Sequence, residues 1–289
     1  MVKIITHSGS FQVDDIFAVA ILILAIGESE VIRTRDKGQI ATADYVVDVG
    51  MIYDPTKNRF DHHQPGGAGE RSNGIAYASC GLVWKKFGEM LSGGKEEADL
   101  IDTKLIAPLD AHDNGIAIAD YHFKNIRTYS VVDFFYSFRV NLHESEEELY
   151  KIFMELVAIA KDLLMREIKK AKLIIESEIK VREAFEMSID KRIIILSEDL
   201  PWGRVLSEKL EVMYVVYPRN DGRWGIRAIP DIGYASRRPL PATWAGKTDK
   251  DLEMITGVTG AVFCHRALFM AVAGTKEGAI RLAEIALNA

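Results

Sequence analysis

Aspartate and histidine side chains gather at a few points in the N-terminal half of the chain. The densest run is Asp61-His62-His63, and Asp48 comes shortly before it. Carboxylate oxygens with imidazole nitrogens, and no thiolates, suit Mn²⁺ or Mg²⁺ better than a structural zinc ion. Two such ions bridged by a carboxylate can activate water and stabilise a leaving oxygen in phosphoryl transfer. We therefore expect a site for one or two divalent cations that supports phosphoester hydrolysis.

Further ligand-type residues lie outside this run. His7 follows a short apolar segment, Asp14 precedes a longer one, and Asp110 and Asp113 lie close together further along the chain. Taken singly, Asp14 is typical of a helix N-cap and His7 of an ordinary loop histidine. Asp48 is different, because a carboxylate in an apolar strand is costly to bury without a partner or a metal. The joint occurrence of these residues favours metal binding.

Short apolar runs in this half predict strands that alternate with helices. The expected strands are Val2–Thr6, Glu30–Thr34, Tyr45–Val49 and Arg59–His63, and the expected helices are Ile16–Ile26, Gly74–Gly88 and Glu96–Ala107. Asp54–Asn58 reads as a turn and Ala107–Gly115 as a loop. Such alternation predicts a parallel sheet, whose ligands bind outside the carboxyl ends of the strands. The candidate residues are therefore expected to converge there.

The second half begins with a long charged segment from Glu144 to about Met187, which predicts one or two long helices. The elements expected after it are the strands Arg192–Leu196, Val212–Tyr217, Trp224–Ile229 and, last, Ala261–His265, and the final helix Lys276–Leu287. We expect an N-terminal α/β domain over residues 1–140, a helical connector over 141–190 and an α+β domain over 191–289.

Composition excludes several classes of protein. The chain has 289 residues and a net charge of −6 from 36 basic and 42 acidic residues, so it has no global basic field for gripping nucleic acid. Its two cysteines do not predict a disulfide scaffold. The N-terminus reads as a strand and Ile16–Ile26 is too short to span a bilayer, so we expect a cytoplasmic protein without a membrane partner. The long helical segment is compatible with a homodimer.

Several longer motifs resemble known families. The run Asp61-His62-His63, with His7 and Asp48 before it, resembles the DHH phosphoesterase superfamily. Over nearly its whole length the chain resembles the melanocyte-proliferating-gene (MYG) family. The motifs that carry this resemblance are THSGSFQVDD (Thr6–Asp15), IRTRD (Ile32–Asp36), ADYVVDVGMIYDPTKNRFDHHQ (Ala43–Gln64), DAHDNGI (Asp110–Ile116), YPRNDGRWGIRAIP (Tyr217–Pro230), RRPLPATWAG (Arg237–Gly246), TGVTGAVFCH (Thr256–His265) and GTKEGA (Gly274–Ala279).

The resemblance implies a Rossmann-like, parallel-sheet DHH domain that carries the metals and a smaller C-terminal domain that binds substrate. It also implies Mn²⁺-dependent phosphodiester chemistry, with eukaryotic relatives described as 3′→5′ RNA exonucleases. The implied metal ligands are His7, Asp14, Asp48, His62 and a carboxylate from the Asp110–Asp113 segment, for which we choose Asp113.

The resemblance also assigns residues around the metals. Asp48 would bridge the ions, His63 would lie beside the scissile phosphate, and Asp61 would orient a neighbouring histidine. RNA or an oligonucleotide is the expected substrate. The C-terminal residues predicted to bind its terminal nucleotide or its phosphates are Arg237, Arg238, His265 and Lys276. For Arg237 and Arg238, surface solubility is an equally good interpretation.

Two departures from the family pattern keep other functions open. Gln12 stands where the family has a histidine, which would weaken one metal site, and the segment after His265 lacks the family's paired glycines. The alternatives are a small-molecule phosphatase, for example a pyrophosphatase, and a metal- or RNA-binding protein with reduced turnover. Metal-dependent hydrolysis would separate the enzymes from the binding protein, and a substrate panel would separate the two enzymes.

Overall fold

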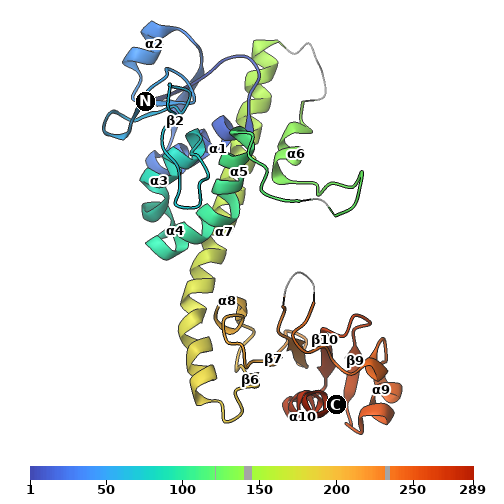
Figure 1. Cartoon of the computed structure of the whole chain (residues 1–289). Helices are drawn as coiled ribbons and strands as arrows, with labels where there is room; N and C mark the ends of the chain where they lie inside the picture. Colours follow the sequence, from blue (N-terminus) through green and yellow to red (C-terminus); the bar gives the residue numbers. More distant parts are fainter. Residues whose placement is uncertain (121, 140–144, 232–234) are drawn as a thin grey trace. The chain divides into compact units, whose positions relative to one another are not determined.

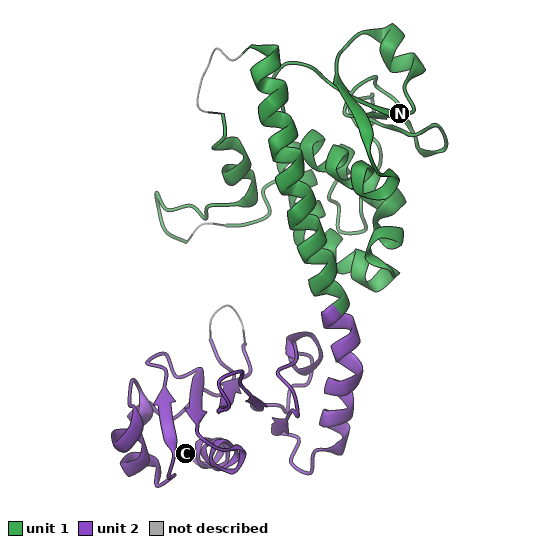
Figure 2. Ribbon diagram, turned by 180° about the vertical axis from the view of Figure 1, so that it is seen from behind, with its two compact units in different colours: residues 1–172 green, residues 173–289 purple. Residues whose placement is uncertain are grey.

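The computed structural model describes residues 1–120, 122–139, 145–231 and 235–289, which form two compact units, 1–172 and 173–289 (Figures 1 and 2). The boundary lies inside α7, Glu146–Met187, which is one continuous helix of 42 residues. Glu144, the predicted start of this helix, lies outside the described residues. The boundary therefore falls within the segment 141–190 that the sequence predicts as a connector.

The first unit is built on a five-stranded sheet in the order β2-β1-β3-β5-β4. Its strands are β1 (Val2–Thr6), β2 (Ser29–Arg33), β3 (Tyr45–Val47), β4 (Tyr53–Asp54) and β5 (Arg59–Phe60). The pairs β1–β2, β1–β3 and β3–β5 are parallel, while β4 joins the edge in the antiparallel direction. The predicted parallel sheet is confirmed, and the carboxyl ends of β1, β3 and β5 lie side by side.

Two predicted strands are shorter in the structure. The predicted strand Tyr45–Val49 ends at Val47, because Asp48 has a backbone φ of 55° in the left-handed region, which does not continue a strand. The predicted strand Arg59–His63 ends at Phe60. The predicted turn after Tyr53 contains the short strand β4 and a 3₁₀ turn at Pro55–Lys57.

Helices that lie beside one another pack on this sheet (Figure 1). They are α1 (Val13–Ile26) and α3 (Ser79–Ser92), which also pack on each other. A π-helical turn at Asp102–Ile106 joins α4 (Lys95–Ile101) to α5 (Ala107–Asp113); α4 packs on α3, and α5 packs on α1 and α3. The helices α2 (Lys37–Thr42) and α6 (Val131–Tyr136) are short. The first ten residues of α1 are buried, as expected for a helix that is apolar on all sides. The predicted loop Ala107–Gly115 is wrong, because Asp110 and Asp113 lie within α5.

The second unit has a mixed five-stranded sheet in the order β6-β7-β8-β10-β9. Its elements are β6 (Ile193–Ile195), α8 (Gly203–Leu206), β7 (Tyr214–Pro218), β8 (Trp224–Ala228), a 3₁₀ turn (Ala242–Trp244), α9 (Asp249–Thr256), β9 (Ala261–Cys264), β10 (Met270–Ala273) and α10 (Lys276–Asn288). The prediction that Ala261–His265 is the last strand is wrong. The segment after His265 returns as β10, which pairs with both β8 and β9.

Each unit has its own hydrophobic core. In the first unit, α1 and α3 share a core with aromatic residues such as Phe153 of α7. In the second, α10 packs against the sheet through Leu282 and Ala286. The fold is thus mixed α/β, with parallel pairing in both sheets. Among the described residues, no helix combines the length and the apolar character needed to cross a bilayer.

Candidate metal centre

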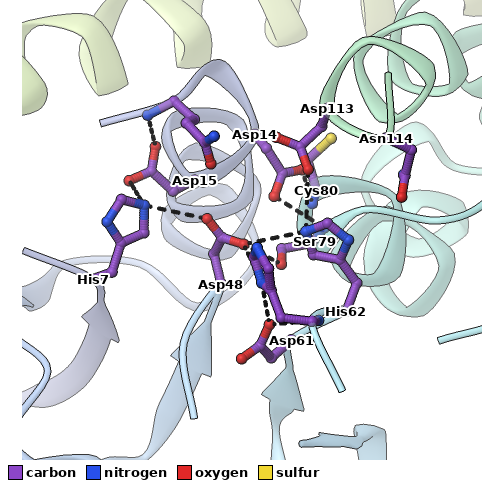
Figure 3. A network of polar contacts seen from close by, with 12 residues as sticks. His7, Asp14, Asp15, Asp48, Asp61, His62, Ser79, Cys80, Asp113 and Asn114 are labelled. Atoms are coloured by element: carbon purple, nitrogen blue, oxygen red, sulfur yellow. Dashed lines mark hydrogen bonds and ion pairs between the residues drawn. The ribbon is translucent and has the colours of Figure 1, made fainter. Parts of the chain in front are cut away.

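Three neighbouring strands deliver polar side chains to the same edge of the first sheet. His7 is the first residue after β1, Asp48 the first after β3 and Asp61 the first after β5. Because these strands are parallel neighbours, their carboxyl ends bring the three residues together. The predicted convergence is confirmed: His7, Asp48 and the residues of the Asp61-His62-His63 run belong to one polar network (Figure 3).

One group of potential ligands consists of His7, Asp15 and Asp48. The Nε2 atom of His7 lies 3.3 Å from Asp15 Oδ2 and 3.3 Å from Asp48 Oδ2. All three residues are buried, and their donor atoms are close enough together to hold one cation. Asp15 is held in place by the backbone N–H of Gln12, which donates to Asp15 Oδ1 at 2.9 Å. The adjacent Asp14 does not take part in this group.

A second group consists of Asp14, His62 and Asp113. His62 Nε2 lies 3.1 Å from Asp113 Oδ2. Asp14 accepts the backbone N–H groups of Ser79 at 3.0 Å and Cys80 at 2.7 Å, which begin α3. The positive end of that helix stabilises a carboxylate at this position. The structure therefore places the two consecutive aspartates in different groups.

Asp48 lies between the two groups, as Figure 3 shows. One of its carboxylate oxygens faces His7, and the other lies 3.4 Å from His62 Nε2. The hydroxyl of Ser79 donates to the second oxygen at 3.1 Å. The left-handed backbone at Asp48 ends the strand there, so this side chain does not follow the alternation of β3. The geometry suits a carboxylate that serves two cation positions.

Burial and charge perturb the pKa values of these groups. Burial raises the pKa of Asp15 to about 7, although the charge of His7 opposes the shift. Burial also raises the pKa of Asp14 well above its ordinary range, with the charge of Asp48 adding to the effect. Burial alone would lower the pKa of His62, but the neighbouring carboxylates of Asp113 and Asp48 raise it to about 10. Crowded carboxylates and raised pKa values are expected where a protein leaves room for a cation.

Several buried polar atoms in this network lack a hydrogen-bond partner. They include Asp15 Oδ2, Asp48 Oδ2 and His62 Nε2. A buried polar atom without a partner costs free energy, and proteins rarely leave several of them in one place without a reason. Each of these atoms points into one of the two ligand groups. The set of donors and its unpaired atoms therefore fit divalent cations.

Asp61 and His63 form a hydrogen-bonded pair on the solvent-exposed side of the network. His63 Nδ1 donates to Asp61 Oδ1 at 2.8 Å, and the His63 backbone N–H donates to the same oxygen at 3.1 Å. The other Asp61 oxygen accepts the backbone N–H of Met51 at 2.6 Å. Asp61 is buried, whereas the His63 side chain is 49% exposed. The pair leaves His63 Nε2 as the ring nitrogen that can reach a ligand.

Asp110 lies apart from His62 and has other partners. It is fully buried and accepts the Cys80 thiol at 3.2 Å and the Gly81 backbone N–H at 3.0 Å. The guanidinium of Arg71 lies 2.6 Å from its other oxygen and also pairs with Asp102. Burial raises the pKa of Asp110 to about 6, and Arg71 opposes that rise. Of the two candidate aspartates, the structure brings Asp113 to His62.

The substrate-binding residues predicted in the second unit have contacts within that unit. Arg237 donates to the carbonyl oxygens of Ser207, Lys209 and Val212. Arg238 donates to carbonyl oxygens near the end of α10. These contacts give both arginines a role in holding the fold, and their contact with substrate stays a prediction.

The other two predicted residues also have neighbours. His265 Nδ1 accepts the Ala267 backbone N–H at 3.0 Å, and its ring centroid lies 4.3 Å from that of Phe269. The Lys276 ammonium lies 5.6 Å from the ring centroid of Trp224. Their roles in binding substrate are also still predictions.

Sequence reasoning missed two polar residues of this network. Asp15 was assigned no role, although the consecutive aspartates at the start of α1 were a signal that either could be a ligand. Arg71, which neutralises Asp110, lies in a segment without a recognisable motif. Which residues fill these positions depends on how α1 and α3 pack, and periodicity does not reveal that.

Sequence comparisons show which proteins this chain is similar to. A family model described as MYG1_exonuc, an uncharacterised protein family (UPF0160), matches residues 3–287. The MYG1 protein of Chlamydia pneumoniae is 31% identical over 98% of this chain and 96% of its own length. The MYG1 protein C27H6.8 of Caenorhabditis elegans is 30% identical over 98% and 94%, and the MYG1 exonuclease of Mus musculus is 27% identical over 99% and 84%.

The chain therefore belongs to the MYG1 family, and the family expected from the sequence is confirmed. Among solved structures, it matches the pGpG-specific phosphodiesterase PggH of Vibrio cholerae over 100% of this chain and 98% of that one. That match has 11% identity and a TM-score of 0.34.

Proposed function

We propose that this protein is a divalent-metal-dependent phosphodiester hydrolase. The observation that carries the proposal is Asp48, a buried carboxylate whose two oxygens face two separate groups of aspartate and histidine ligands. Family membership supports the same class of activity, since the mouse and human relatives are named MYG1 exonuclease. We further propose that the first unit is a Rossmann-like domain of the DHH type and that the second unit binds substrate.

The proposed ligand set has two cation positions. One consists of His7, Asp15 and Asp48. The other adds Asp14, His62 and Asp113 to the second oxygen of Asp48, and the donors suit Mn²⁺ or Mg²⁺. Asp15 thus supplies a carboxylate to the position that Gln12 was expected to weaken. A divalent cation held there would polarise a phosphoryl oxygen and lower the pKa of a water molecule.

Side chains around the two cation positions would bind the phosphate, transfer a proton and orient the metal ligands. Asp61 fixes the ring of His63 by accepting from its Nδ1–H. In the imidazolium form, the exposed Nε2–H could then donate a hydrogen bond to a phosphate oxygen or pass its proton to the leaving oxygen. The Gln12 backbone N–H orients Asp15, and the first turn of α3 orients Asp14. These contacts hold the ligands in position before substrate arrives.

The proposed substrate is RNA or a short oligonucleotide that is shortened from its 3′ end. The names of the mammalian relatives support an exonuclease. The test is hydrolysis of a 5′-labelled RNA ladder, a matching DNA and pyrophosphate with Mn²⁺, with Mg²⁺ and with EDTA. We expect stepwise RNA shortening that requires the metal.

Two variants locate the activity. Asp48→Asn should lower the rate by more than about a hundredfold, since even residues behind metal ligands contribute ten- to a hundredfold. Asp99→Asn is the matched control, because Asp99 is exposed and lies outside the network. Hydrolysis of pyrophosphate alone would indicate a small-molecule phosphatase. Metal binding without turnover on any substrate would indicate a binding protein, and full activity of Asp48→Asn would refute the proposed centre.

A further inference from the structure

A cavity of about 1030 Å³ opens directly beside the metal centre, and all of its lining residues belong to the first unit. His7, Asp48, Asp61 and His63 form one part of its lining. A ligand with a phosphate at these residues would therefore continue into the cavity. The volume lies at the upper end of the range of about 300–1,000 Å³ that small-molecule sites occupy, which is ample for a nucleotide.

The cavity is lined by both acidic and basic residues. Asp48 and Asp61, at the metal centre, are its acidic lining residues, whereas its basic residues are Arg35, Lys37, Arg59 and Arg139. Arg59 donates to backbone carbonyls, and Arg139 donates to the Ser10 hydroxyl.

Arg35 and Lys37 are exposed. In the described part of the chain, no hydrogen bond or ion pair is formed by either side chain. Two unpaired cations beside a metal centre favour a ligand that carries a second negative charge.

The remaining wall of the cavity is largely apolar. It includes Ile40, Val49, Met51, Ile52 and Tyr136. Met51 and Ile52 are each 54% exposed, which is unusual for two large neighbouring apolar side chains in a hollow. Inorganic phosphate or pyrophosphate would leave this surface uncovered, whereas the base and sugar of a nucleotide would cover it.

We propose that this cavity holds the nucleotide next to the scissile phosphate, with its base and sugar on the apolar wall and its outer phosphate paired with Arg35 and Lys37. The position of the scissile phosphate in this inference rests on the proposed function. The nucleotide site itself rests on the cavity and its lining residues. It makes a terminally phosphorylated dinucleotide a better substrate than an unphosphorylated one. It also gives the first unit a specificity element that is independent of the residues predicted in the second unit.

The test compares three diadenylate dinucleotides, one with a 5′-phosphate, one with a 3′-phosphate and one with neither. The variant is the double substitution Arg35→Ala and Lys37→Ala. The control is Arg166→Ala with Lys170→Ala, which removes the same two types of charge from exposed positions of α7 outside the cavity. The readouts are kcat/KM with Mn²⁺ and equilibrium binding in EDTA, where no turnover occurs.

We expect the wild type to prefer one of the phosphorylated dinucleotides by about ten- to a hundredfold, the usual range for contacts to a charged group. The cavity variant should lose that preference and keep its activity on the unphosphorylated dinucleotide, while the control keeps both. A preference that survives in the cavity variant, or an equal loss on all three dinucleotides, would overturn the proposal.

The binding measurement separates this inference from the proposed function. If the wild type hydrolyses none of the dinucleotides, the catalytic proposal fails. Tighter binding of a phosphorylated dinucleotide that disappears in the cavity variant would still support the nucleotide site. Equal binding of all three dinucleotides by the wild type would overturn it.

Discussion

Replacing Asp15 with asparagine should stabilise the metal-free protein at alkaline pH and weaken metal binding. Asp15 is fully buried, and burial raises its pKa from an ordinary 3.8 to about 7. In the unfolded chain this carboxyl ionises near pH 4, whereas in the folded protein it holds its proton until about pH 7. Its contribution to the free energy of unfolding therefore falls as the pH rises from about 4 to 7.

The size of the effect follows from the same shift. Each pKa unit corresponds to about 1.4 kcal/mol, so ionised Asp15 destabilises the metal-free protein by about 4 kcal/mol above pH 7. Asparagine cannot ionise, and its Oδ1 atom can still accept the Gln12 N–H. We expect Asp15→Asn to match the wild type near pH 4 and to exceed it by as much as about 4 kcal/mol at pH 8.

Urea unfolding in EDTA at a series of pH values measures this difference, and Asp99→Asn serves as the exposed control. Adding Mn²⁺ should reverse the order, because the wild type gains stability from a ligand that the variant binds less well. A stability difference that does not change with pH would refute the assigned burial cost. Equal stabilisation of both proteins by Mn²⁺ would refute Asp15 as a ligand.

Three other measurements test the same network. Mn²⁺ affinity should rise between pH 5 and 8, with proton release in calorimetry, because Asp15 with a pKa of about 7 and His62 with a pKa of about 10 must lose protons to bind the ion. Arg71→Met leaves Asp110 buried without its cation and should cost about 3–5 kcal/mol in urea unfolding; a cost below 1 kcal/mol would contradict the pairing. Gly81→Ala places a Cβ atom 1.8 Å from an Asp110 oxygen and should lower stability by about 3 kcal/mol or more; an unchanged melting temperature would contradict that packing.

Local patterns in the sequence were sufficient to predict the central strands and the first helix of the first unit. Apolar runs predicted β1, β2 and β3, and the apolar stretch of α1 predicted a buried helix. Each pattern depends on neighbours within a few residues, so it can be read along the chain. The parallel alternation then placed His7, Asp48 and Asp61 at one edge before any distance was known.

Longer-range packing decided features that the local patterns misjudged. The sequence predicted no strand after His265, but that segment forms β10 because β8 and β9 both offer it hydrogen bonds. The segment that contains Asp110 and Asp113 ends in an Asn-Gly pair typical of a turn, yet it forms α5 and packs on α1 and α3. The partners β8 and α1 are both far away in the sequence.

The sequence by itself determined which residue types meet at the edge of the first sheet, because aspartate and histidine follow neighbouring parallel strands. Its motifs also pointed to the family that the comparisons confirm. Only the tertiary structure decided how the potential ligands are distributed between the two groups. Asp14 and Asp15 are adjacent on one helix, where successive side chains point in directions about 100° apart, so one turns toward α3 and His62 and the other toward His7. Composition and spacing give both residues the same chemistry, and only the packing around α1 gives them different positions.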